Sequence, residues 1–137
     1  PDVDKPVVYA QIGALDQSII VGDKMIGVSL DKYLGKDYPV YTRFYTAQQR
    51  ETMERKYIVP DCLTFYLLSL YPMKDHDQRP QLERDLHVGK VMWTVNKVLP
   101  HPAFNGRFIK MVDRYMKCHK DVTVEQLLKS NDYSQFK

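Results

Sequence analysis

The class of fold is decided at residues 18–30, SIIVGDKMIGVSL, where two apolar runs flank a turn signal. Ile26, Val28 and Leu30 alternate with small or polar residues, which is the two-residue period of a strand with one buried face. The pair Gly22-Asp23 between the runs is typical of a β-hairpin turn. Together with an earlier β-prone run at residues 7–12, this pattern predicts a small N-terminal antiparallel sheet built around a hairpin.

After residue 38 the pattern changes from strand to helix. Periodicity, proline positions and two capping boxes predict helices at residues 38–56 (as one helix or two), 60–71, 82–99, 108–116 and 123–128. Strands followed by helices favour the α+β class, with the sheet followed by a helical bundle. The chain has 137 residues and shows no linker or repeat, so we expect a single domain over residues 1–137.

The helix at 82–99 carries the clearest apolar stripe in the chain. Its members recur at helical spacing and are Val88, Val91, Met92, Val95, Val98 and Leu99. The helix at 60–71 is apolar on nearly every side, so we expect it to be buried and to pack against this stripe. Gly89 lies beside the stripe. Since glycine costs about 1 kcal/mol relative to alanine inside a helix, its presence predicts the close approach of another backbone.

Composition excludes few functions. The net charge is +3, and the densest basic stretch, Arg107–Lys120, has helical spacing, so it is interpreted as a solvated helix face and not as a nucleic-acid footprint. No apolar run reaches the 18 residues typical of a membrane span. Cys62 and Cys118 are compatible with free thiols or with one disulfide.

No intact catalytic or cofactor motif is present. The six glycines form no phosphate-binding loop, and no Gly-x-Ser-x-Gly elbow occurs. The four histidines are too widely spaced in sequence to form a zinc-peptidase signature. We therefore predict no catalytic residues, no metal ligands and no cofactor, and the sequence favours a non-enzymatic role without deciding the question.

Four residues stand out as candidates for binding: Asp31, Tyr33, Asp61 and His87. Asp31 and Tyr33 follow the predicted strand, where side chains often project into a cleft. Alternatively, Asp31 caps the following turn and Tyr33 packs. His87, in Glu83-Arg84-Asp85-Leu86-His87, could act as a general base beside a carboxylate, or could pair locally with these acids on the helix side.

At Asp31-Lys32-Tyr33-Leu34-Gly35, followed by Tyr41, the chain resembles the GldB-like family of gliding-motility lipoproteins. Weaker similarity follows at Tyr57–Asp61, at Gly89-Lys90, at Met111–Met116 and at Val124–Leu128. The family looks like a zincin-type fold that has lost its metal motif. The segment Pro60–Tyr71 occupies the place of the zinc helix and offers Asp61, Cys62 and Phe65 instead of two histidines and a glutamate, which leaves no preformed zinc site.

The resemblance implies a cell-envelope, extracytoplasmic protein that is part of a longer lipoprotein. It would be periplasmic, would contact the membrane only through an N-terminal lipid outside these residues, and would bind other envelope proteins but no nucleic acid. The first hypothesis is thus a non-catalytic domain working through protein contacts. The alternative is a diverged zincin-like hydrolase with an atypical site made from Asp61, His87 and Asp31.

Overall fold

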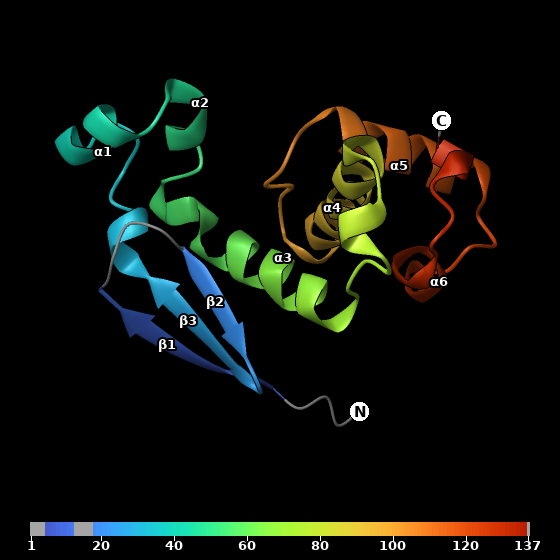
Figure 1. Ribbon diagram of the computed structural model, residues 1–137, viewed down its shortest axis with the longest axis horizontal. Coiled ribbons are helices and arrows are strands. Elements are labelled where there is room, and N and C mark those ends of the chain that lie inside the picture. Colours follow the sequence, from blue (N-terminus) through green and yellow to red (C-terminus); the bar gives the residue numbers. More distant parts are fainter. Residues whose placement is uncertain (1–4, 13–17, 137) are drawn as a thin grey trace. The chain divides into compact units, whose positions relative to one another are not determined.

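A computed structural model of the chain describes residues 5–12 and 18–136 (Figure 1). The chain divides into two compact units, Pro1–Tyr66 and Leu67–Lys137, and each is described here by itself. The N-terminal unit holds the strands and the C-terminal unit is helical, which confirms the predicted α+β class. The elements are β1 (Val7–Gln11), β2 (Ile19–Gly22), β3 (Met25–Ser29), α1 (Pro39–Phe44), α2 (Ala47–Arg50), α3 (Ile58–Leu70), α4 (Gln81–Val98), α5 (Arg107–Cys118) and α6 (Val124–Lys129).

The sheet has three strands in the order β1-β3-β2. The predicted hairpin is confirmed, because β2 and β3 pair antiparallel, with Ile19 opposite Val28. Its two-residue turn is Asp23-Lys24, and Lys24 takes a positive φ of 55°. The expectation of a wholly antiparallel sheet is wrong for β1, which pairs parallel with β3. After β1 the chain forms β2 at the opposite edge of the sheet and then β3 in the centre. Because β1 is parallel to β3 and β2 is antiparallel to it, the sheet is mixed.

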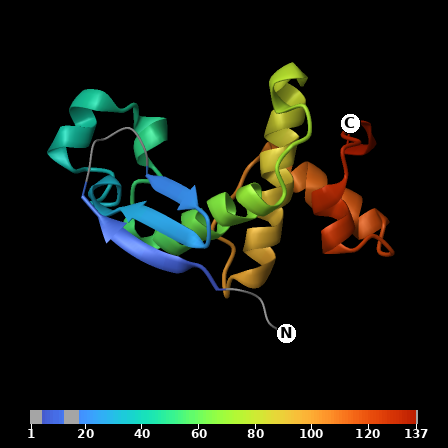
Figure 2. The same ribbon diagram turned by 60° about the horizontal axis from the view of Figure 1, so that its bottom comes forward.

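One side of the sheet packs against α3, as both ribbon views show (Figure 1, Figure 2). The core of this unit contains Ile19, Ile26, Val28 and Tyr33, and α3 contributes Ile58, Cys62 and Tyr66 from one stripe at a spacing of four residues. The expectation that the helix at 60–71 is buried all round is wrong. Val59, Phe65 and Leu70 remain exposed, because a single three-stranded sheet covers only one stripe of the helix.

The connection between the sheet and α3 forms two short helices. Pro39 opens α1, where its missing N–H is not needed. Thr46 caps α2 in a full capping box, since its hydroxyl accepts from the Gln49 N–H while the Gln49 side chain accepts from the Thr46 N–H. The segment 38–56 is therefore two helices, which the sequence left open.

In the C-terminal unit, α4 is surrounded by α5, α6 and the chain end. The core contains Met73, Leu86, Trp93, Val112, Leu127, Tyr133 and Phe136. The stripe predicted on α4 is partly wrong. Val91 and Val95 are buried, but Val98 is 66% exposed, whereas Lys90, which is not part of the predicted stripe, is fully buried. The buried face is displaced towards Leu86 and Trp93 because these larger side chains fill the space between α4 and the elements that follow it.

The predicted close approach at Gly89 is confirmed. A Cβ atom placed there would lie 3.0 Å from the Cβ of Phe108 and 3.2 Å from its backbone carbonyl carbon. The approaching backbone is therefore the first turn of α5, which packs on α4. The predicted capping box at Thr123 is also present, and it starts α6, whose Leu127 and Leu128 are buried.

Candidate functional site

The segment Asp31–Gly35 connects the sheet to the helices through a 3₁₀ turn at Leu30–Lys32. Gly35 takes a φ of 111°, a conformation that side chains rarely tolerate, and its N–H donates to the carbonyl of Met53 at 2.9 Å. The buried hydroxyl of Tyr41 donates to the Asp31 carbonyl and accepts from the Leu34 N–H. These bonds fix the turn and therefore the direction of the side chains it carries.

Tyr33 and Asp61 are brought together by this turn. They lie 28 residues apart, and the Tyr33 hydroxyl donates to Asp61 Oδ2 at 2.7 Å. Tyr33 is buried, and Asp61 lies in the first turn of α3. The Tyr33 ring therefore packs in the core, as one interpretation expected. Its hydroxyl donates to a carboxylate, so the same side chain also remains a candidate site residue.

A cleft of about 230 Å³ opens over this pair. It is lined by Ser18, Lys32, Tyr33, Tyr45, Gln49, Thr52, Met53 and Asp61. Lys32 is buried, and its ammonium group donates to the Tyr45 hydroxyl at 2.6 Å. The cleft therefore holds a buried cation and a half-buried carboxylate, each with a tyrosine hydroxyl as a neighbour.

Burial changes the acid–base properties of the cleft. It raises the pKa of Asp61 to about 6, although the hydrogen bond from Tyr33 acts in the opposite direction. Burial, and next the bond to Asp61, raise the pKa of Tyr33, so the phenol keeps its proton. Asp61 can therefore take up or release a proton near neutral pH.

Asp31, the third candidate of this region, is not among the residues lining the cleft. It is half-buried and contributes its backbone carbonyl to the bond with Tyr41. The N-cap position of the 3₁₀ turn is Ser29, so Asp31 does not cap that turn. The structure thus brings two of the predicted site residues, Tyr33 and Asp61, into one cleft.

His87 belongs to the other unit and has both ring nitrogens occupied. Nε2 lies 2.8 Å from the Tyr71 carbonyl, which can only accept, so Nε2 carries the proton. Nδ1 then accepts from the Tyr133 hydroxyl at 2.9 Å. Burial, and next the charge of Lys90, lower the pKa of His87 to about 4. The ring is a neutral link between α4 and two loops, and its nitrogens are not available to act as a general base.

Sequence reasoning missed the buried lysine beside His87. The Lys90 ammonium donates to the Ser130 carbonyl at 2.8 Å and lies 4.6 Å from the centre of the Tyr133 ring. Burial, and next the charge of Arg79, lower the pKa of Lys90 to about 8. Its partners lie 40 or more residues further along the chain, so local periodicity gave no signal for this contact.

Within residues 5–12 and 18–136, no group of three histidine, cysteine, aspartate or glutamate residues is placed to hold a metal ion. Both cysteines are free thiols, with Cys62 half-buried and Cys118 exposed. None of the helices in the described ranges has the length and apolarity needed to span a bilayer.

The protein is thus an α+β chain in which an Asp-x-Tyr-Leu-Gly turn leads into a polar cleft. Residues 1–108 match the family described as gliding motility protein GldB, and the chain belongs to this family. Membership implies a gliding-motility-associated lipoprotein and indicates a cell-envelope location. The similarity read at Met111–Met116 and at Val124–Leu128 lies beyond the matched residues. No curated protein and no solved structure matches the chain significantly.

Proposed function

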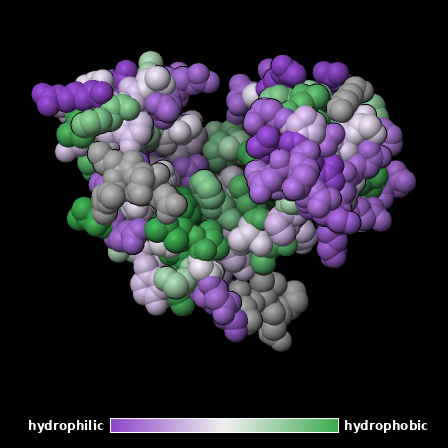
Figure 3. All heavy atoms as spheres, in the orientation of Figure 1, coloured by the Kyte–Doolittle hydropathy of each residue, from purple (hydrophilic) through white to green (hydrophobic). Residues whose placement is uncertain are grey.

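We propose that this chain is a non-catalytic, periplasmic domain that binds other envelope proteins, while an N-terminal lipid outside these residues tethers it to the membrane. Its family supports the envelope location and the lipid tether. The observation that carries the binding role is the exposure of β1. Val7, Val8 and Tyr9 are 54%, 59% and 53% exposed, and Figure 3 shows apolar residues at the surface over the sheet.

Strand β1 offers both an apolar surface and a free backbone edge. Among the described residues it pairs with β3 alone, so its other edge has no strand beside it. The Val7 N–H donates to the Lys24 carbonyl, and in a parallel ladder the backbone groups point alternately to the two sides. The N–H groups of Val8 and Ala10 therefore point to the free edge.

These features suit an extended segment of a partner protein that adds to the sheet as a fourth strand. Backbone hydrogen bonds to Val8 and Ala10 would supply affinity, and contacts with the exposed side chains would supply selectivity. An open apolar edge is otherwise an aggregation hazard, which partner binding removes.

The test is site-specific photo-crosslinking in cells of the source organism. A photoreactive residue at Tyr9 is compared with one at Phe44, which is 69% exposed on α1 in the same unit. We expect Tyr9 to yield one discrete adduct with an envelope protein and Phe44 to yield none. The purified partner should then bind at least 10-fold more weakly to Val8→Lys than to Phe44→Lys. Equal adducts at both positions, or equal weakening by both lysines, would exclude β1 as the binding surface.

One observation favours the alternative, a diverged zincin-like hydrolase. Asp61 lies in a cleft, accepts a proton near pH 6 and has a phenol and an ammonium group among its neighbours in the lining, an arrangement suited to general acid–base chemistry. Because the nitrogens of His87 are occupied, such an enzyme would depend on Asp61. Hydrolysis of peptide or ester substrates that falls at least 100-fold in Asp61→Asn, with a pH limb near 6, would support it. Activity that is equal in this variant would eliminate it.

A further inference from the structure

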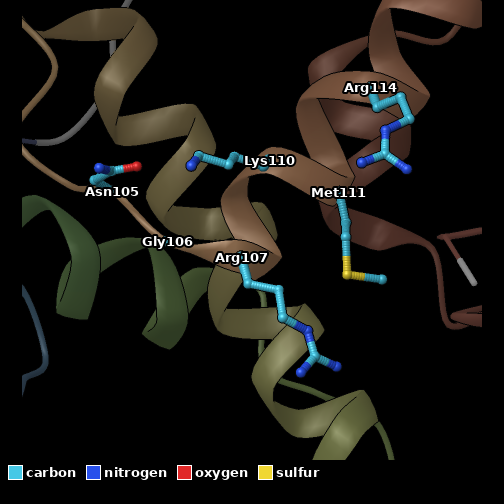
Figure 4. Close-up of a pocket in the computed structure, with 6 residues that line it drawn as sticks. All are labelled: Asn105, Gly106, Arg107, Lys110, Met111 and Arg114. Atoms are coloured by element: carbon cyan, nitrogen blue, oxygen red, sulfur yellow. The ribbon is translucent and has the colours of Figure 1, made fainter.

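The basic stretch of α5 has no role in the proposed function. Arg107, Lys110 and Arg114 line a hollow of about 340 Å³ together with Asn105, Gly106 and Met111. Figure 4 shows Lys110 extending towards Asn105, while Arg107, Met111 and Arg114 project from successive turns of α5. No acidic side chain lines this hollow.

Two lysines of the same unit that lie outside this hollow are held in ion pairs. Lys117 is paired with Asp113 at 2.8 Å, and Lys129 with Glu125 at 2.6 Å. Among the described residues, Arg107, Lys110 and Arg114 make no ion pair. Three unpaired like charges on one hollow repel one another, and a bound anion would remove that repulsion. The guanidinium groups suit a phosphate in particular, because their planar fork can donate two hydrogen bonds to it.

A second hollow of about 320 Å³ adjoins the first and is mainly apolar. The two share Asn105, Gly106 and Arg107 in their linings. The second is lined by Val88 and Met92 of α4 and by Phe108 and Ile109 of α5, with Asp85 also in the lining. A cationic hollow next to an apolar one matches a ligand that carries an anionic phosphate on a hydrocarbon chain.

We infer that the C-terminal unit binds anionic phospholipid, with the phosphate on Arg107, Lys110 and Arg114 and the start of an acyl chain against Val88, Met92 and Phe108. The inference rests on the envelope location of the proposed function but not on partner binding through β1. It adds a second membrane contact to the lipid tether. A basic surface adds electrostatic attraction to an anionic bilayer.

The first test measures binding of the full chain to vesicles of phosphatidylcholine alone or with 30 mol% phosphatidylglycerol by co-sedimentation. The triple variant Arg107→Gln, Lys110→Gln, Arg114→Gln is compared with Lys117→Gln, Lys120→Gln, Lys129→Gln, which removes the same charge from the same unit. Each basic residue near an anionic surface contributes about fivefold in affinity. We expect a loss of roughly 100-fold for the first triple variant and less than tenfold for the second, with thermal unfolding confirming that both are folded. Equal losses would overturn the inference.

The second test separates a lipid from other phosphates. Short-chain dihexanoylphosphatidylglycerol, glycerol 3-phosphate, inorganic phosphate and a 12-base-pair DNA duplex are titrated into the labelled chain by NMR. The lipid should bind at least 10-fold more tightly than either small phosphate and shift the amides of both α4 and α5. Equal binding of the lipid and inorganic phosphate, or tight binding of the duplex abolished by the same triple variant, would overturn the assignment of a phospholipid. Neither outcome bears on β1, whose crosslinking test stands separately.

Discussion

Each unit buries a lysine, Lys32 or Lys90, and the two units differ in how much apolar surface they cover. The N-terminal unit half-buries the Asp61 carboxylate and leaves β1 exposed along its length. The C-terminal unit closes its core around α4 and buries His87 and Lys90. The exposed apolar strand β1 is the surface on which the proposed partner would bind.

The largest expected effect is the loss of a core side chain in the C-terminal unit. Leu86→Ala removes a fully buried side chain and should cost about 2–5 kcal/mol of unfolding free energy. Val8→Ala, on the exposed strand, should change it by no more than about 0.5 kcal/mol. Urea denaturation of both variants measures the contrast. A cost for Val8→Ala as large as that for Leu86→Ala would mean that β1 is covered in the free protein.

The next effect is an opposite response of the two units to acid. The raised pKa of Asp61 means that its contribution to stability is full below its ordinary pKa of 3.8 and is lost as the pH rises through about 6. The lowered pKa of His87 means that its contribution is full above 6.5 and is lost as the pH falls through about 4. Each contribution is about 2 kcal/mol after allowance for solvent screening.

Variants of Asp61 and His87 separate the contributions of the two side chains to the pH dependence of stability. Denaturation at pH 4, 5 and 7 should show Asp61→Asn gaining on the wild-type protein as the pH rises, and His87→Gln gaining on it as the pH falls. The two difference curves should therefore have opposite slopes. If the two difference curves have the same slope, either Asp61 does not favour its neutral form in the folded protein or His87 does not.

A smaller effect tests the packing of α5 on α4. Gly89→Ala places a methyl group against the Phe108 backbone and should lower stability by about 1–2 kcal/mol, even though alanine favours the helix. Gly106→Ala is the control, because nothing lies within 4 Å of its added Cβ and its φ of 165° is extended backbone. If Gly89→Ala is as stable as the control or more stable, α5 does not approach α4 as described.

The features that the sequence predicted correctly depend on patterns among residues that are close together in the chain. Alternation at Ile26 and Val28 identified the hairpin, and the capping boxes at Thr46 and Thr123 located two short helices. The sequence also indicated a close approach at Gly89, because an interior helical glycine is costly, but the partner could not be named.

The remaining features depend on contacts between distant residues. No residue pattern in or beside β1 predicts its parallel pairing. The pairing follows from the fold, in which β3 lies between β1 and β2. Lys90 becomes a core residue only because Ser130 and Tyr133 return to it. Tyr33 and Asp61 were each identified as candidates, but the hydrogen bond that joins them spans 28 residues.

The most direct test of the central claim is hydrogen exchange at β1, measured by NMR for the free chain and for its complex with the crosslinked partner. In the free chain the Tyr9 amide, which faces β3, should exchange slowly, and the Val8 and Ala10 amides should exchange fast. We expect binding to slow exchange at Val8 and Ala10 at least 10-fold and to leave Tyr9 little changed. Unchanged exchange at Val8 and Ala10, with protection elsewhere, would contradict it.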